Sequence, residues 1–294
     1  MSVRITQKSI AQSSLAGLTG NLARLGKVQE QLSSGKLISR PSDSPSGTVA
    51  AMQLRSDIRV NEQYGRSADD GMGRLSTTDG QLQDALEVLH SARGVVLQGM
   101  NTGSVSPAAR EALATQLETL RDALISQANT TYLGRPIFGG TTAGDVAYAA
   151  DGTFLGNSSP VTRTVAAGSD VRVDVSGPEV FGDDATGVFA TLTAMAGHLR
   201  ADPEALGADL TQLDSNVARV IGAAGDIGAR TNRVEAARAA AADRALTLRG
   251  GLGAVEDIDL PRTIVAMHLQ EAAYQAALGA TAKIITPSLV EFLR

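Results

Sequence analysis

The stretch that decides the fold is LGADLTQLDSNVARVIGAAGDIGAR, residues 206–230. Its apolar positions follow one another at alternating intervals of four and three residues: Leu206, Leu210, Leu213, Val217, Val220, Ala224 and Ile227. This spacing places the side chains on one face of an α-helix, at the a and d positions of a heptad. The same phase continues at Val234, Ala241, Ala245 and Leu248. The sequence therefore predicts a coiled-coil-like helix of about six heptads.

Apolar stripes of the same kind predict helices near both ends of the chain. In the first segment the stripe consists of Leu15, Leu18, Leu22, Leu25 and Leu32. In the last segment it consists of Ile264, Met267, Tyr274, Leu278 and Ile285, and the segment closes on Leu289, Phe292 and Leu293. We expect Asp257 or Asp259 to cap this last helix, with Pro261 in its first turn.

Two more helices are expected between the first segment and the middle of the chain. One begins at Pro45, with Ser44 as its N-cap, and ends near Met100. Its glycines indicate either close helix packing or a break. They are Gly65, Gly71, Gly73 and Gly80. The other helix follows Ser106-Pro107 and carries leucines at positions 113, 117, 120 and 124.

Glycines also mark the expected joints between helices. Gly35 follows the first stripe, and Gly250-Gly251-Leu252-Gly253 is expected to interrupt the long helix. Residues 250–253 do not resemble a phosphate-binding loop, because no strand precedes them and no Lys-Ser/Thr follows. Gly35-Lys36 likewise lacks the upstream glycine of such a loop. We interpret Gly35, Gly250 and Gly251 as flexible joints.

The middle of the chain has a different texture, rich in glycine and proline. Residues 161–165 (VTRTV) and 170–175 (DVRVDV) alternate with a period of two, which is typical of half-buried strands. The expected domains are a terminal coiled-coil domain, a long-helix rod domain and a small β-containing outer insertion. Their ranges are 1–40 with 251–294, 41–140 with 187–250, and 141–186. The expected fold is mainly α: an elongated rod in which the first helix pairs with the last and the inner long helices pair with each other.

The composition excludes several classes of protein. The 294 residues include 26 basic and 31 acidic side chains, a net charge of -5, which argues against nucleic-acid binding because phosphate contacts need clustered Lys and Arg. Aromatic residues make up 3% of the chain and hydrophobic residues 43%, which favours narrow helical stripes over a thick core. No window approaches about 20 apolar residues, so no membrane span is expected. The opening MSVRITQ, residues 1–7, lacks the apolar region of a secretory signal peptide.

No constellation of residues indicates catalysis. The chain has no cysteine, and its histidines, His90, His198 and His268, lie in different segments without metal-ligand spacing. No Ser/His/Asp grouping and no nucleophile elbow stands out. We therefore expect a protein that is not an enzyme and that holds no cofactor and no metal.

The flanks of the two terminal helices are the expected functional surface. Helices tied on through glycine joints have little to pack against except each other, and a two-helix pair leaves apolar flanks exposed. We hypothesise that the two stripes named above, together with Leu289 and Phe292, pack subunits against one another. Truncating residues 1–32 or 257–294 should abolish assembly and leave the inner helices folded.

Three motifs resemble the terminal regions of bacterial flagellins: QLSSGK at 31–36, DDGM at 69–72 and SLVEFL at 288–293. The resemblance covers roughly the first 140 and the last 105 residues. Two further motifs are similar to the hook–filament junction proteins of that superfamily, the third hook-associated proteins. RPSDSPSG at 40–47 resembles their Arg-Pro-Ser-Asp-Asp-Pro-x-Gly, with Ser44 in place of the second Asp. YLGRPIFGGT at 132–141 resembles their Tyr-Leu-Phe-Gly-Gly-Thr with an added segment.

The resemblance implies a flagellin-like fold and a structural role in the bacterial flagellum. The terminal helices would form an inner tube, the long helices a second layer, and the insertion would face outward. The protein would leave the cell through the flagellar type III apparatus without a cleaved signal peptide, after a cytoplasmic export chaperone has covered its C-terminal region. It would then form a homo-oligomeric ring between the first hook-associated protein on the hook side and flagellin on the filament side.

Three alternatives stay open at this point. The first is a short flagellin, the filament subunit itself. The second is a helical enzyme, which would need a pocket lined by convergent polar groups. The third is a cytoplasmic coiled-coil scaffold, which would explain the heptads but not the Pro-Ser-Asp-Ser-Pro motif at 41–45.

Overall fold

The computed structural model describes residues 7–100 and 106–292, without the side chains of residues 7, 8, 10, 11 and 283–292. Contacts divide the chain into two compact units, residues 1–59 with 245–294 and residues 60–244. We name them the terminal unit and the central unit. The three-part division expected from the sequence stays a prediction, and the boundaries between the two units fall inside helices.

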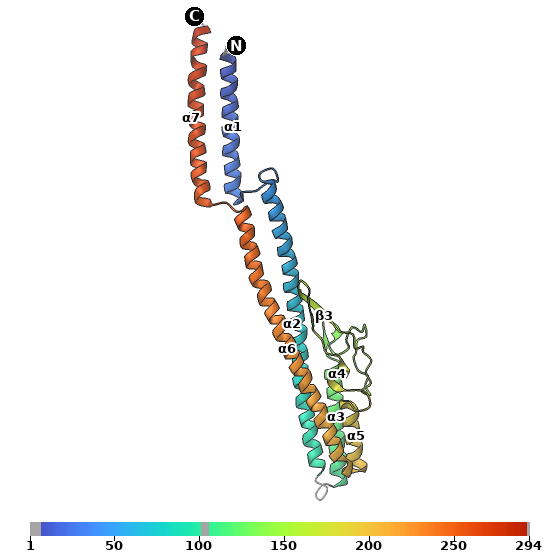
Figure 1. Ribbon diagram of the computed structural model, residues 1–294. Helices are drawn as coiled ribbons and strands as arrows, with labels where there is room; N and C mark the ends of the chain where they lie inside the picture. Colours follow the sequence, from blue (N-terminus) through green and yellow to red (C-terminus); the bar gives the residue numbers. More distant parts are fainter. Residues whose placement is uncertain (1–6, 101–105, 293–294) are drawn as a thin grey trace. The chain divides into compact units, whose positions relative to one another are not determined.

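Helices make up most of the described chain (Figure 1). The long helices are α1 (Gln7–Ser34), α2 (Pro45–Gly99), α3 (Pro107–Ala128), α6 (Leu206–Glu256) and α7 (Leu260–Phe292). The shorter ones are α4 (Gly177–Phe181), α5 (Val188–Ala201) and the 3-10 turn η1 (Pro203–Ala205). The described strands are β1 (Thr131–Tyr132), β2 (Arg135–Pro136), β3 (Thr162–Ala166) and β4 (Ser169–Arg172), paired as two antiparallel hairpins. A mainly α fold with a small β-containing insertion is therefore confirmed.

The helix starts lie where the capping residues predict them. α2 begins at Pro45, and the Ser44 hydroxyl accepts a hydrogen bond from the backbone N–H of Gly47 at 3.2 Å. Ser106 caps α3 in the same way, through the N–H of Ala109 at 3.2 Å. At α7 the cap is Asp259, which accepts from the N–H of Arg262 at 3.1 Å. Each cap pairs one of the backbone donors that a helix start leaves unsatisfied.

Two glycine-rich stretches do not interrupt their helices. α2 is continuous from residue 45 to residue 99, past Gly65, Gly71, Gly73 and Gly80. α6 continues through residues 250–253 to Glu256, so the interruption expected at Gly250 and Gly251 is wrong. A Cβ atom at Gly251 would lie 3.7 Å from Leu54 Cδ2, so this part of α6 lies close to α2 within the terminal unit. That contact helps offset the cost of a helical glycine, about 1 kcal/mol relative to alanine.

The core of the central unit follows the heptad face of α6. Its buried members include Leu206, Leu213, Val217, Val220, Ile227 and Val234. Within this unit α2 runs antiparallel beside α6 (Figure 1). Polar contacts tie the two helices at three levels: Asn61 Nδ2 to Ala241 O at 2.7 Å, Asp69 to Arg238 at 2.7 Å, and Arg93 to Asp214 at 2.8 Å. The expected pairing of the inner long helices is confirmed there.

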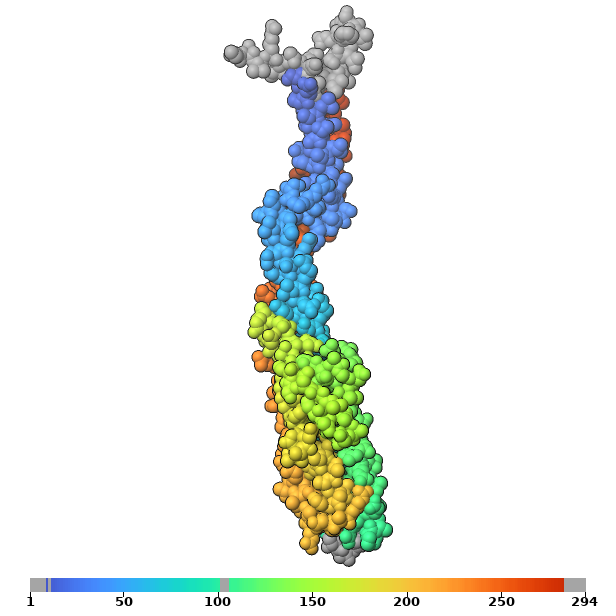
Figure 2. All heavy atoms as spheres, turned by 90° about the vertical axis from the view of Figure 1, so that its right-hand side faces the viewer, coloured from blue at the N-terminus to red at the C-terminus, as the bar shows by residue number. Residues whose placement is uncertain are grey.

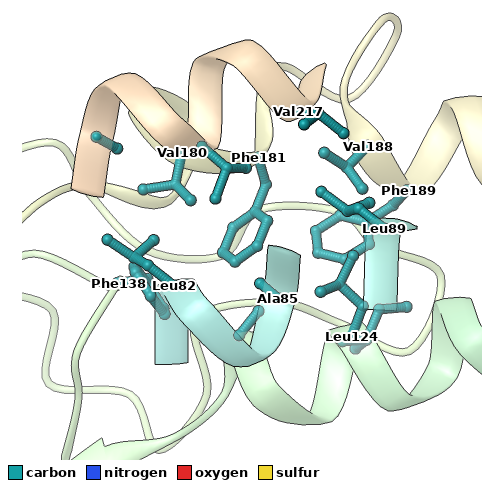
Figure 3. Close-up of a cluster of buried hydrophobic side chains, with 14 of the residues drawn as sticks. Leu82, Ala85, Leu89, Leu124, Phe138, Val180, Phe181, Val188, Phe189 and Val217 are labelled. Atoms are coloured by element: carbon teal, nitrogen blue, oxygen red, sulfur yellow. The ribbon is translucent and has the colours of Figure 1, made fainter. Parts of the chain in front are cut away.

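The insertion closes over the other side of this core with aromatic side chains. The ring centroids of Phe138 and Phe181 lie 5.2 Å apart in an edge-to-face arrangement, and Tyr148 lies 4.9 Å from Phe189. Figure 3 shows Phe138, Phe181 and Phe189 meeting Leu82 and other apolar side chains of the long helices. The few aromatic residues of this chain are thus concentrated where the insertion meets the helices. Edge-to-face pairs of this kind add about 0.5–1.5 kcal/mol beyond their buried area.

One face of the central unit is formed by the insertion together with α5. In Figure 2 these segments, coloured yellow-green to gold, cover the side of the unit that is turned to the viewer. On this face α5 packs against α3. The long helices of this unit therefore have one face occupied by the chain itself.

Candidate assembly surface

In the terminal unit, α1 and α7 lie side by side and antiparallel (Figure 1). Their pairing, which the sequence predicts, is confirmed. Yet no described side chain of α1, residues 9 and 12–34, or of α7, residues 260–282, is buried. Two helices in contact along one line cannot enclose a core, because each side chain at the line still borders solvent on one flank.

The predicted stripes lie at or near this line of contact and remain open. Their half-buried members are Leu18, Leu25, Leu32, Met267 and Tyr274. Their exposed members are Leu15, Leu22, Ile264 and Leu278, of which Leu15 keeps 54% of its surface exposed. The stripe continues at Ile285, Leu289 and Phe292, whose side chains lie outside the described residues.

A second apolar row on α7 lies on the side of the helix that faces away from the stripe. Val265 and Leu269 are spaced four residues apart, so they share one face of the helix. They keep 67% and 66% of their surface exposed. The sequence analysis missed this row because it followed the single strongest heptad phase. Val265 and Leu269 lie outside that phase, because they follow Ile264 and Met267 by one and two positions.

The terminal unit exposes further apolar residues where α2 begins and α6 ends. They are Leu37, Val49, Met52, Leu246 and Leu260. By contrast, leucines of the central unit such as Leu75, Leu82 and Leu89 are fully buried. The continuous apolar core belongs to the central unit, whereas the paired helices α1 and α7 of the terminal unit leave their apolar residues half-buried or exposed.

The two connections of the terminal unit are joined to each other. Gly35 ends α1 with a φ of +69°, a left-handed conformation that favours glycine at a helix C-terminus. Its carbonyl accepts a hydrogen bond from Ile258 N at 3.1 Å, and Leu37 N donates to Glu256 O at 2.6 Å. Lys36 and Asp257 thus form an antiparallel bridge between the α1–α2 and α6–α7 connections. We call residues 35–37 with 256–258 the clasp.

Charged side chains reinforce the clasp. Lys36 Nζ lies 2.6 Å from Asp257 Oδ1 and 3.5 Å from Glu256 Oε2. Arg55 lies 2.9 Å from the same Glu256 carboxylate, which is almost fully buried. The hydrogen bond that Lys36 donates to Asp257 raises the pKa of Lys36 above its ordinary value; desolvation lowers it, and the charges of Asp257 and Glu256 raise it further. A buried carboxylate held by two cations fixes the place where the chain turns between helices.

The turn that precedes α2 is anchored to α1. Asp43 Oδ2 accepts hydrogen bonds from the backbone N–H groups of Ser39 and Arg40 at 3.2 and 3.0 Å. Its other oxygen lies 2.9 Å from Lys27 Nζ. The hydrogen bond from Lys27 and those from the backbone lower the pKa of Asp43. The Pro-Ser-Asp-Ser-Pro motif thus shapes the entry into α2.

Nothing in the described part of the chain assembles a metal site, since no three His, Cys, Asp or Glu residues there come together as ligands. No helix among the described residues is long and apolar enough to cross a membrane. The candidate functional feature of the terminal unit is its exposed apolar surface.

Comparisons with known proteins agree with this architecture. Residues 5–143 match the family described as bacterial flagellin N-terminal helical region. Flagellar hook-associated protein 3 of Escherichia coli is 25% identical over 304 aligned positions, which cover 95% of this chain and 96% of that protein. Flagellin of Bacillus subtilis is 27% identical, but the aligned part covers 63% of this chain and 60% of that flagellin.

A solved structure ascribed to a flagellar hook-associated protein of Vibrio parahaemolyticus has the same fold. It is 25% identical and superposes with a TM-score of 0.67, covering 73% of this chain and 99% of that structure. The match to hook-associated protein 3 extends over nearly the whole chain, whereas the flagellin match is shorter. The chain therefore belongs to the flagellin superfamily, among the hook–filament junction proteins that hook-associated protein 3 represents.

Proposed function

We propose that copies of this chain assemble into a ring at the hook–filament junction, and that the exposed apolar faces of α1 and α7 bury against neighbouring copies. The observation that carries the proposal is the absence of any buried side chain among those described in these two helices. A stable fold with such a surface gains free energy when another molecule covers it.

The free energies of burial and ordering favour this contact in an assembly but do not force a free subunit to associate. Fully burying one Val or Leu side chain contributes about 1.5–3 kcal/mol. Val265, Leu269 and Leu22 together would therefore supply several kcal/mol for each contact between copies. Ordering terminal residues on assembly costs about 1–2 kcal/mol per residue and opposes this gain. A free subunit in the cell would thus stay unassembled until neighbouring subunits offer many contacts at once.

The remaining steps of this role follow from the resemblance to the junction proteins. The chain would be exported through the flagellar type III apparatus without a cleaved signal peptide and would act outside the cell. A cytoplasmic chaperone would cover its C-terminal region before export. In the junction it would contact the first hook-associated protein on one side and flagellin on the other. It would act as a structural protein without enzymatic activity.

The proposed flexible joint of the terminal unit is the clasp. Gly35 stands at a chain turn, whereas Gly250 and Gly251 lie inside α6. We propose that bending between a curved hook and a stiffer filament is taken up at residues 35–37 and 256–258. Gly251 would supply close packing against Leu54 of α2 instead of a hinge.

The proposal is tested by complementation with a double variant of the α7 row. Cells that lack this protein are given a chain with Val265→Asp and Leu269→Asp. Two carboxylates in a face that must be buried would carry a desolvation cost without a partner. We expect the variant to be exported but not retained, so that electron microscopy finds bare hooks and flagellin appears in the medium.

The matched control places the same charges on the central unit. Leu155 and Ile221 are as open as the stripe leucines, with 54% and 52% of their surface exposed. Cells with Leu155→Asp and Ile221→Asp should carry complete flagella. Complete flagella in cells with the α7 variant, at a normal amount of protein in the junction, would refute the role of this face.

The alternative role as a filament subunit is separated by removing the protein altogether. A junction protein is needed to retain flagellin, so cells without it should keep their hooks and release intact flagellin. A filament subunit would instead be missing from the medium as well as from the hook. Immunoblots of the medium with antibody against the cell's flagellin distinguish the two outcomes.

A further inference from the structure

A cationic pocket opens on the central unit between α2, the β1–β2 hairpin and the start of β3. It encloses about 430 Å³. Its walls include Asp70, Arg74, Tyr132, Leu133, Arg135 and Arg163. Three guanidinium groups thus face one carboxylate, on a chain whose net charge is -5. None of the residues of the assembly surface lines this pocket.

The single carboxylate of the pocket neutralises one of the three arginines. Arg163 Nε lies 2.6 Å from Asp70 Oδ2 and donates a further hydrogen bond to Thr162 O. Arg135 is exposed, and no carboxylate within the described residues forms an ion pair with it. The positive charge of Arg135 therefore has no negative partner at the pocket.

The third arginine is buried and incompletely hydrogen-bonded. Arg74 keeps 4% of its surface exposed, and its Nη2 donates to Ile137 O at 3.1 Å. Its Nε has no acceptor among the described residues. Burial lowers the pKa of Arg74, the charge of Asp174 opposes this, and the charges of Arg163 and Arg135 lower it further. Asp174 Oδ1 accepts hydrogen bonds from Arg172 and Val161, and no hydrogen bond joins Asp174 to Arg74 within the described residues.

Leu133 provides an independent observation at the same place. It occupies the tip of the β1–β2 hairpin with a φ of +51°, where glycine or asparagine is the usual residue. It also keeps 80% of its surface exposed. Neither the backbone nor packing inside the chain accounts for a leucine here. Leu133 lies in the pocket wall, so contact with a bound molecule would explain why a leucine stands at this position.

We propose that this pocket binds a carboxylate, with Arg135 and Arg163 as donors to its oxygens and Leu133 in contact with its carbon chain. Arg163 Nη2 and the whole Arg135 guanidinium carry N–H groups suited to the paired oxygens of a carboxylate. The buried charge of Arg74 adds attraction from the floor of the pocket. The carboxylate belongs either to a free organic acid or to an Asp or Glu side chain of a second copy.

The first arm of the test is a titration of the purified full chain with glutarate, a small dicarboxylate, followed by calorimetry. We expect saturable binding of one glutarate per chain, weakened at least tenfold by Arg135→Gln. Arg135 is suited to substitution because it is exposed and forms no ion pair within the described chain. The matched control is Arg66→Gln, which removes the same charge from the exposed surface of α2 outside the pocket and should bind like the unaltered chain.

The second arm detects a carboxylate that belongs to another copy. Arg135→Lys places a primary amine at the pocket, which a carbodiimide joins to a neighbouring carboxylate as an amide. In flagella prepared from cells with this variant, cross-linked dimers above the level of Arg66→Lys indicate a side chain of a second copy.

The results distinguish a free acid, a carboxylate of a second copy and the absence of a carboxylate site. Binding of glutarate without cross-linked dimers assigns the pocket to a free acid, and dimers assign it to a second copy. The absence of both, or equal weakening by Arg66→Gln, would overturn the proposal. The titration uses the unassembled chain, so its result does not depend on the proposed role of α1 and α7.

Discussion

At the scale of single residues, backbone conformation decides several positions that apolar patterns do not reveal. Gly140 and Gly168 both adopt left-handed backbone, with φ values of +65° and +69°. They differ in their surroundings, because a Cβ at Gly140 would lie 2.1 Å from Asn157 O, whereas nothing lies within 4 Å of one at Gly168. Leu133 adopts the same region with a bulky side chain.

The two glycines predict a graded series. Gly168→Ala should lower the free energy of unfolding by about 1–2 kcal/mol, the cost of left-handed backbone for an L-residue. Gly140→Ala adds a clash with backbone and should lower it by about 2–5 kcal/mol in all. Urea denaturation followed by circular dichroism measures both. Equal losses would show that the contact with Asn157 is relieved without cost.

At Leu133 we expect a substitution to raise the free energy of unfolding instead of lowering it. Leu133→Gly releases about 1–2 kcal/mol of backbone strain and costs about 0.5–1 kcal/mol in chain entropy. The variant should therefore be more stable than the unaltered chain by roughly 0.5–1 kcal/mol. Leu155→Gly is the control, since Leu155 is exposed without a positive φ, and it should show no gain. A loss of stability in Leu133→Gly would mean that the leucine packs inside the free chain.

At the scale of elements, burial separates helices that look alike in sequence. Leu89 of α2 and Leu22 of α1 both belong to heptad-like stripes, but Leu89 is fully buried and Leu22 keeps 52% of its surface exposed. Charged groups also join particular pairs of helices. Arg200 of α5 holds Glu111 and Glu118 of α3, with distances of 2.9 and 2.6 Å.

Truncation of these leucines should affect different properties. Leu89→Ala removes a core side chain and should lower the free energy of unfolding by about 2–5 kcal/mol. Leu22→Ala should change the stability of the free chain by less than about 1 kcal/mol, because the side chain is half open already. Its effect should appear as weakened retention at the junction. Thermal unfolding and counts of filamented cells measure the two effects, and a large stability loss in Leu22→Ala would contradict an open stripe.

The contacts of Arg200 predict a response to acid. Its hydrogen bonds lower the pKa of Glu111 and of Glu118 below their ordinary value near 4.5. A carboxylate with a lowered folded pKa stabilises the fold above the unfolded pKa, and this contribution is lost as the pH falls through the folded pKa. Arg200→Gln should therefore lose stability less steeply than the unaltered chain from about pH 5 towards pH 3. Urea midpoints against pH test this, with Arg66→Gln as the control that keeps the steep slope.

At the scale of the whole molecule, the two units have different kinds of stability. The continuous core, from Ala68 to Val234, belongs to residues 60–244. The terminal unit holds its helices through the α1–α7 pair and the clasp, without buried side chains in the described parts of either helix.

A shortened chain tests this difference. Removal of residues 1–34 and 260–294 takes away α1 and α7 but no residue of the central core. The shortened chain should unfold cooperatively, with a midpoint within a few degrees of the full chain, and should not enter the junction. Calorimetry and complementation measure these outcomes. A shortened chain without a cooperative transition would show that the central unit depends on the terminal helices.

The sequence by itself determined the helices and their caps, because heptad spacing and capping side chains act through neighbours along the chain, and its short motifs indicated the superfamily by resemblance. Ser44, Ser106 and the α6 stripe needed no tertiary information. The tertiary structure decided that α6 passes through Gly250 and Gly251, where the contact of Gly251 with Leu54 of α2 offsets the weak helix propensity of glycine. It also decided the clasp and the arginine pocket, which join residues far apart in the chain. Spacing gives no signal for such contacts, because they depend on where folding places each helix.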